Sequence, residues 1–229
     1  MKSIDKIEQE KAEYRQLLYN RVNEYVTGVT SGEIIACESI KQCIRRYLRD
    51  LENPDYYINY DAIDRFWNFC YYVRIEGKKN EYIQFVPECW QAFYLYCIWG
   101  FYLKNRPERR RFLRSFLTVS RKQGKTTLLC INALFATSKE SDNAKVYLVS
   151  QSKNTANDSA LFLSKKIIEN SPALAKRFDC LQYSISCKKN KSTSSFKMLP
   201  CKATAMNAIK PTYAIVDELH LMQNSEIVD

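Results

Sequence analysis

The sequence predicts an α/β protein in which a mostly parallel sheet follows a helical N-terminal region. From about residue 112, apolar strand-like segments alternate with helix-like segments, whereas the first 84 residues show mainly helical patterns. The chain has 229 residues, enough for one sizeable core and a smaller attached subdomain. We therefore expect a helical region over 1–84 and the sheet within 85–229.

Three helices are expected in the N-terminal region. Residues 2–26 form a charged helix with an apolar stripe, and Thr30 with Glu33 fits a capping box that opens a second helix over 34–51. Asn53-Pro54 ends that helix, and Asp61 can cap a third over 62–74. Its aromatic residues are more typical of packing than of a base-stacking platform, so we do not interpret this region as a separate binding module.

The remaining elements alternate between helices and strands. After a turn at 77–80, Pro87 begins a helix that reaches about residue 104, and another is expected from about Lys153 to Asn170. The polar stretch KKNKSTS separates two strand-like segments that predict a hairpin. The expected strands are 113–119, 144–150, 181–187, 195–200 and 212–218.

The loop SRKQGKTT, residues 120–127, lies between an expected strand and the helix-like segment LLCINALFA. It ends like the phosphate-binding pattern G-x-x-x-x-G-K-[ST], although Val119 stands where that pattern begins with glycine. A strand, a tight loop and a helix would point backbone N–H groups at an anion, with Lys125 reaching the outer phosphates and Thr126 ligating magnesium. Gly124 would let the backbone approach the phosphate. The triplet alone also fits a solvated basic turn.

A second feature makes a nucleotide site the better interpretation. The apolar strand YAIV ends in Asp217 and Glu218, about 90 residues after Lys125. Strand ends of an open α/β sheet meet at the ligand-binding edge, and adjacent residues on a strand point to opposite faces. Asp217 is then expected to hold magnesium together with Thr126, and Glu218 to polarise the attacking water. The pair alone fits a solvated turn or a helix cap equally well, but both features in this order predict ATP binding.

The net charge of +10 indicates a polyanionic partner, although many basic proteins bind none. Residues 104–114, KNRPERRRFLR, hold six basic residues and one acid, and KKNK at 188–191 is a second basic cluster. Either cluster could contact nucleic-acid phosphates or be a solvated face or hairpin tip.

The cysteines and the hydropathy argue against a metal site, a signal peptide and a membrane span. The nine cysteines contain no C-x-x-C pair and His220 is the only histidine, which argues against a Cys/His metal site and favours reduced thiols. The start of the chain is polar and charged, unlike a signal peptide, and the apolar run 92–103 is too short to span a bilayer. We expect a soluble, intracellular protein with no membrane partner.

With these motifs in place, the sequence resembles the large terminase subunit of tailed bacteriophages, the motor that threads DNA into an empty capsid. SRKQGKTT resembles its deviant Walker A, and YAIVDELH resembles its Walker B. PECWQAFYLYCIWGFY is similar to the segment that carries the family's adenine-contacting glutamine, and YVTGVTSGEIIACESIKQCIRRYLRDL resembles its leading helices. The likeness covers roughly residues 20–225. It implies a P-loop NTPase of the RecA-like (ASCE) type.

The resemblance also implies roles for individual residues. Glu218 would activate water, Lys125 would bind phosphate, and Thr126 and Asp217 would support Mg²⁺. Arg121 would stabilise the γ-phosphate, unless an arginine from a neighbouring subunit does so. Gln91 would contact adenine, although it also fits a polar residue on a mostly buried helix. The implied nucleotide-binding residues are Gln91, Ser120, Arg121, Lys122, Gln123, Gly124, Lys125, Thr126 and Thr127.

The partners implied by the resemblance are double-stranded DNA, the capsid portal and a small terminase subunit, with assembly into a homo-oligomeric ring at the procapsid portal in the host cytoplasm. The family continues beyond Walker B with a coupling motif and a nuclease domain, whereas this chain stops at Asp229. We therefore expect a truncated ATPase core over 85–229, with its sheet incomplete at the C terminus because the strand between those of Walker A and Walker B is missing. Nuclease activity is not expected, and whether the chain alone hydrolyses ATP is open.

Two alternatives remain at this point. The letters DELH also satisfy the DExH pattern of helicases, but a helicase needs a second RecA-like domain, for which the chain lacks the length. A non-catalytic degenerate fragment would bind a partner or DNA without saturable ATP binding. Substituting Lys125 would change nothing in such a fragment.

Overall fold

A computed structural model describes residues 4–78, 81–139, 143–150, 160–188, 193–200 and 210–217. The chain forms two compact units. The first contains residues Met1–Tyr71 and Phe85–Thr118, and the second contains Tyr72–Gln84 and Val119–Asp229. Each unit is described by itself.

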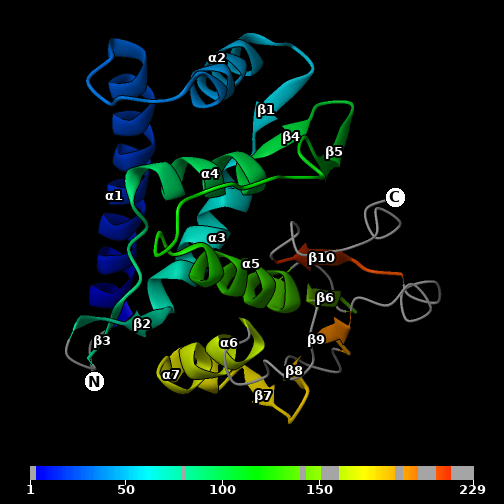
Figure 1. Ribbon diagram of the computed structural model, residues 1–229. Coiled ribbons are helices and arrows are strands. Elements are labelled where there is room, and N and C mark those ends of the chain that lie inside the picture. The colour runs from blue at the N-terminus through cyan, green and yellow to red at the C-terminus, as the bar shows by residue number, and fades with distance from the viewer. Residues whose placement is uncertain are drawn as a thin grey trace. The chain divides into compact units, whose positions relative to one another are not determined.

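The first unit combines four helices with a small antiparallel sheet. Helix α1 (Ile4–Ser31) packs against α4 (Cys89–Gly100), and the others are α2 (Glu38–Glu52) and α3 (Tyr60–Tyr72) (Figure 1). The strands β1 (Tyr56–Ile58), β4 (Phe101–Leu103) and β5 (Arg106–Arg110) lie in the order β1-β4-β5. Large apolar side chains fill the core because each helix turns its apolar face inward. The most deeply buried include Leu18, Ile63, Phe66, Trp67, Leu95 and Phe101.

Two predicted helix starts in this unit are wrong. Thr30 lies inside α1, where its hydroxyl donates to the Val26 carbonyl at 2.7 Å, so it forms no capping box with Glu33. The helix ends one residue later because Gly32 adopts a φ of 84°, and α2 begins only at Glu38. Helix α3 is capped by Asn59 instead of Asp61, since the Asn59 side chain accepts from the Ala62 amide at 3.0 Å. The predicted end of α2 before Asn53-Pro54 is confirmed.

The second unit is built on a five-stranded sheet in the order β10-β6-β9-β8-β7. Strands β10 (Tyr213–Val216), β6 (Lys145–Ser150) and β9 (Ser195–Pro200) are parallel to one another, whereas β8 (Ser184–Cys187) and β7 (Phe178–Cys180) continue antiparallel. Helix α5 (Lys125–Lys139) packs on β6, β8, β9 and β10, and α6 (Ala160–Glu169) packs on α5 and β8 (Figure 1). The short α7 (Pro172–Ala175) and the hairpin β2 (Arg74–Glu76) and β3 (Tyr82–Gln84) complete the unit.

Most of the expected sheet is confirmed, including the strands at 145–150 and 213–216 and the hairpin of β8 and β9. The sheet is mixed, not mostly parallel, because β8 and β7 join it as antiparallel strands. The predicted strand at 113–119 is wrong. Those residues pair with no strand in the described part of the chain, and Leu113 and Phe116 are 60% and 79% exposed. An apolar segment becomes a strand only where a neighbour completes its hydrogen bonds.

Two kinds of feature are missing from the described residues. None of the helices described is both long and apolar enough to cross a membrane. No group of three or more His, Cys, Asp and Glu side chains that could hold a metal ion is found among the same residues.

Candidate functional site

The loop before α5 has an unusual backbone. Gly124 adopts a φ of 77° and Lys122 a φ of 64°, so two left-handed residues flank Gln123. Glycine adopts this conformation without strain, whereas lysine does so at a cost. The helix then starts at once, because the Leu128 amide donates to the Gly124 carbonyl at 3.0 Å. The strand predicted before this loop is absent, but the predicted loop and helix are present.

The start of α5 is rich in positive charge. Arg121, Lys122 and Gln123 are exposed, as is Ser120, while the residues from Gly124 to Thr127 are partly buried. The first turn of α5 holds no acidic residue and begins with Lys125. Since the N-terminus of a helix already carries a partial positive charge, cations there are unfavourable unless an anion is close. The arrangement therefore favours binding of an anion.

An anionic side chain reaches this helix from the sheet. Asp217 follows β10 directly, and its amide donates to the Val149 carbonyl at 3.3 Å, so the ladder with β6 continues to this residue. Its carboxylate Oδ1 lies 3.2 Å from Lys125 Nζ. The side chains of Lys125 and Asp217 are 28% and 19% exposed, so solvent reaches both only in part. The structure thus brings together the lysine of the first motif and the aspartate of the second.

The packing of α5 on the sheet explains where the ion pair of Lys125 and Asp217 lies. Helix α5 lies on β10 and β6, and its inward face is apolar, with Leu128, Ile131 and Leu134 almost completely buried. The Cys130 thiol donates to the Ala160 carbonyl of α6 at 3.0 Å. Burial raises the pKa of Cys130 to about 12, and the negative charge of Asp217 contributes to the rise. The cysteine is therefore a protonated packing residue near the site.

The residues present fit a nucleotide with its magnesium ion. Thr126 carries a hydroxyl in the first turn of α5, and Asp217 supplies a carboxylate that already faces a cation, the Lys125 ammonium. Hydroxyl and carboxylate oxygens are the ligands that Mg²⁺ prefers. Glu218, expected to activate water, and His220 lie outside the described residues.

Gln91 has a structural role that the sequence analysis missed. It lies in α4 of the first unit, is only 8% exposed, and its side-chain oxygen accepts from the Glu88 amide at 3.0 Å. The Glu88 side chain accepts in return from the Gln91 amide, which completes a capping box. The spacing of Glu88 and Gln91 was the signal that could have revealed it. The adenine contact stays a prediction.

Two further features were not predicted. The direct ion pair of Lys125 with Asp217 was not foreseen, since the sequence placed both residues near phosphate and magnesium instead. The left-handed conformation of Lys122 has no sequence signal, because lysine shows no preference for it. Of the expected site residues, Ser120 to Thr127 and Asp217 lie in the second unit and Gln91 in the first.

Comparison with known proteins gives the family. No significant match is found to a curated protein or to a solved structure. The family described as the terminase large subunit, ATPase domain, matches residues 89–229, which is more than half of the chain and includes both the loop before α5 and Asp217. The chain therefore belongs to the terminase large subunit ATPase domain family.

Proposed function

We propose that the chain is the ATPase motor portion of a phage terminase, which hydrolyses ATP at the loop 120–127 to drive double-stranded DNA into a capsid. The observation that carries this proposal is the 3.2 Å approach of Lys125 Nζ to Asp217 Oδ1. Two segments about 90 residues apart meet at the N-terminus of one helix, which is where a P-loop ATPase needs its phosphate-binding lysine and its magnesium-binding acid. The family match supports the ATPase part of the proposal.

Each residue of the site has a proposed task. The backbone amides around Gly124 and the Lys125 ammonium bind the phosphates, and the exposed Arg121 offsets negative charge on the γ-phosphate. Thr126 and Asp217 would hold Mg²⁺, which neutralises phosphate charge when it is bound. Glu218, next to Asp217 in the sequence, would accept a proton from the attacking water. To contact phosphate, the Lys125 ammonium must move away from the Asp217 carboxylate.

The proposal extends to the assembly of the motor. We propose that copies of the chain act as a homo-oligomeric ring at the portal of the procapsid, in the cytoplasm of the bacterial host, together with a small terminase subunit. In such a ring an arginine of a neighbouring copy could replace Arg121 at the γ-phosphate. A variant with Arg121→Ala tests this point, because hydrolysis that survives the substitution would favour the neighbour's arginine.

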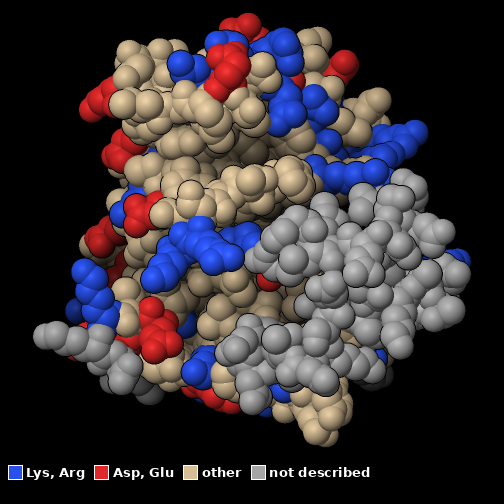
Figure 2. Space-filling view, in the orientation of Figure 1, with Lys and Arg blue, Asp and Glu red and all other residues tan. Residues whose placement is uncertain are grey.

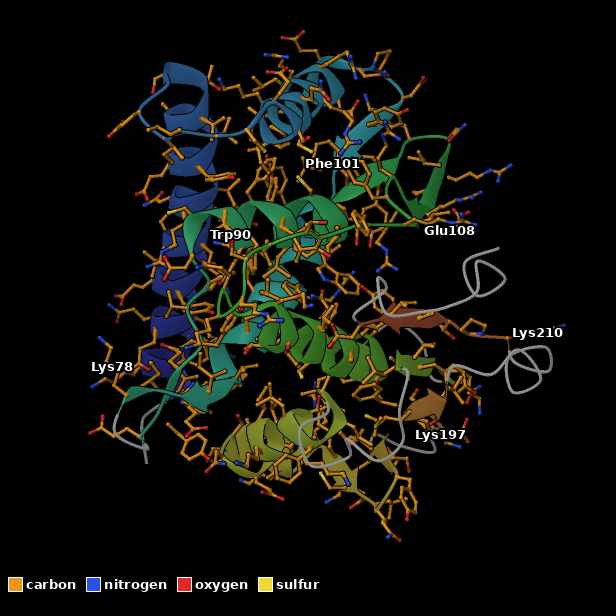
Figure 3. All side chains as sticks on the ribbon, in the orientation of Figure 1. Lys78, Trp90, Phe101, Glu108, Lys197 and Lys210 are labelled. Carbon is orange, nitrogen blue, oxygen red and sulfur yellow. The ribbon has the colours of Figure 1, made fainter. Side chains whose placement is uncertain are left out.

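The test of the ATP site is calorimetry with ATP and Mg²⁺ on the chain and on Lys125→Ala. We expect binding by the parent chain and a loss of about 1.5 to 3 kcal/mol in the variant, because a charge contact to phosphate is removed. Lys197→Ala is the matched control, since Lys197 is an exposed lysine on β9, in the sheet against which α5 packs (Figure 3). Equal binding by the parent chain and Lys125→Ala would contradict the proposal.

Two assays separate the proposal from its alternatives. A helicase would separate the strands of a duplex in an ATP-dependent manner, whereas a packaging motor moves along an intact duplex. A non-catalytic binding protein would show no saturable binding of ATP at all. The proximity of Lys125 and Asp217 does not separate a motor from a helicase, since a helicase also hydrolyses ATP, whereas a non-catalytic binding protein does not require it.

A further inference from the structure

Basic side chains gather on the hairpin of β4 and β5 in the first unit. Figure 2 shows Lys and Arg side chains over β4, β5 and the nearby α2. Strand β5 lies at the edge of its three-stranded sheet, with β4 as its neighbour in that sheet. The sequence of this cluster, residues 104–114, fits both a contact with phosphates and a solvated face. Five of its six basic residues form two groups with different surroundings, and the sixth, Arg114, is exposed beyond the end of β5.

The first group, Arg110 and Arg111, anchors the hairpin. The Arg110 guanidinium lies 4.4 Å from the centre of the Trp99 ring, and that of Arg111 lies 4.2 Å from the centre of the Tyr56 ring. Arg111 also pairs at 3.3 Å with Asp50, which is only 3% exposed. Guanidinium groups stacked on aromatic rings and paired with a buried acid hold their strand firmly. These two arginines are therefore engaged in the fold.

The second group, Lys104, Arg106 and Arg109, is exposed, and we name it the basic hairpin surface. The register pairs Tyr102 with Arg110 and Leu103 with Arg106, which leaves residues 107–109 bulging out of the ladder. No salt bridge joins these three cations to an acid in the described part of the chain. Glu108, marked on β5 in Figure 3, is the only acid between residues 104 and 114. The surface thus presents unneutralised positive charge on an anchored strand.

We propose that the basic hairpin surface contacts the phosphate backbone of double-stranded DNA. The inference rests on the proposed function, to which it adds a place where the chain holds its DNA. Arginine forks bind phosphate oxygens in pairs, and contacts to the backbone are independent of base sequence, as a motor that moves along DNA requires.

The surroundings favour a duplex over a single strand. Proteins that hold single strands stack the bases on exposed aromatic rings, and residues 104–110 contain no aromatic residue. The adjacent Phe112 packs against Phe101, with the guanidinium groups of Arg46 and Arg111 each 5.1 Å from the centre of its ring. It is therefore engaged in packing. Charged residues on an edge strand also prevent aggregation, a role that predicts no effect on DNA binding.

The experiment measures binding of a short fluorescein-labelled DNA duplex to the full chain by anisotropy, over a range of salt concentrations. The test variant is Arg106→Ser with Arg109→Ser. Loss of two phosphate contacts should weaken binding by about tenfold to sixtyfold near ~0.1 M salt and reduce the slope of log K against log salt by about 1.8. Arg45→Ser is the matched control, because Arg45 is exposed but already paired with Glu38 at 2.7 Å, and it should bind as the parent chain does.

Several outcomes would overturn the inference. These are equal binding by the parent chain and the double variant, no binding by the parent chain, and tighter binding of a single strand than of the duplex. If the double variant fails to fold, Arg109→Ser alone is the test variant. It should reduce the slope of log K against log salt by about 0.9. Calorimetry with ATP on the same samples separates this inference from the proposed function. Loss of DNA binding with ATP binding intact supports the surface, whereas absent ATP binding in the parent chain refutes only the ATP site.

Discussion

Helices α4 and α5 begin in opposite ways. Helix α4 begins at Cys89 after a capping box, in which the cap residue Glu88 and Gln91 satisfy each other's backbone amides. The Glu88 carboxylate, at the cap position before the first turn, also complements the positive end of the helix dipole. Helix α5 begins after two left-handed residues, with Lys125 in its first turn and no acid there. One helix start is satisfied by its own sequence, whereas the other concentrates positive charge.

The start of α5 gives up stability that the start of α4 keeps. A cation in the first turn of a helix costs about 0.3 to 1 kcal/mol, and a left-handed lysine adds about 1 to 2 kcal/mol. Both costs fall on the loop of α5, and part is offset by Asp217, which pairs with Lys125 from the end of the sheet. A bound phosphate would offset more. The start of α4 needs no ligand to be stable.

The largest effect is expected at Asp217. Asp217→Asn removes the carboxylate that pairs with Lys125 and would hold Mg²⁺, so binding of ATP with Mg²⁺ should weaken by about 2 kcal/mol, or roughly thirtyfold. Binding of ATP in the presence of a chelator should not weaken, because the variant removes a negative charge near the phosphates. Calorimetry with and without Mg²⁺ measures both affinities.

The control for this substitution is Asp179→Asn. Asp179 pairs with Lys188 at 3.0 Å in the same sheet, and its side chain is 56% exposed. The control should keep the preference for ATP with Mg²⁺. If Asp217→Asn also keeps that preference, the aspartate has no part in the metal site, and the start of α5 is not part of a site for ATP with Mg²⁺.

A smaller effect is expected at the start of α4. Gln91→Ala and Glu88→Ala each remove one half of the capping box, and each should lower the free energy of unfolding by about 1 kcal/mol. Thermal unfolding of the two variants measures this loss. The two variants also test the adenine contact. If Gln91 contacts adenine, Gln91→Ala should reduce the preference for ATP over GTP, whereas Glu88→Ala should not. Equal preferences in both variants would leave Gln91 as a capping residue alone.

The sequence predicted those parts of the fold that depend on local pattern. The helix of α5, the strand of β10 and the hairpin of β8 and β9 follow from periodicity and turn residues. The site motifs predicted that Lys125 and Asp217 lie close together, since both occupy the edge where strands and loops meet. Candidate caps only two residues apart, such as Asn59 and Asp61, could not be distinguished by propensity.

The features that could not be predicted depend on distant neighbours. Residues 113–119 read as a strand, but a strand also needs a partner, and no periodicity supplies one. The hairpin of β2 and β3 follows three N-terminal helices, yet it belongs to the second unit, where the Arg74 amide donates to the Ser171 hydroxyl at 2.8 Å. The φ of Lys122 is likewise set by closure of its loop and not by its own preference.

The smallest effect is expected at Lys122, whose φ of 64° is the strained half of the loop before α5. Lys122→Gly relieves about 1 to 2 kcal/mol of strain but gains freedom in the unfolded chain worth about 0.5 to 1 kcal/mol, so stability should rise by about 0 to 1.5 kcal/mol. Lys122→Val removes the same charge but places a β-branched residue at positive φ, so stability should fall. Urea unfolding of both variants compares the two at equal charge. If the valine variant is as stable as the glycine variant, the backbone of Lys122 is unstrained, and the start of α5 differs from that of α4 by its charge and its lack of a capping box.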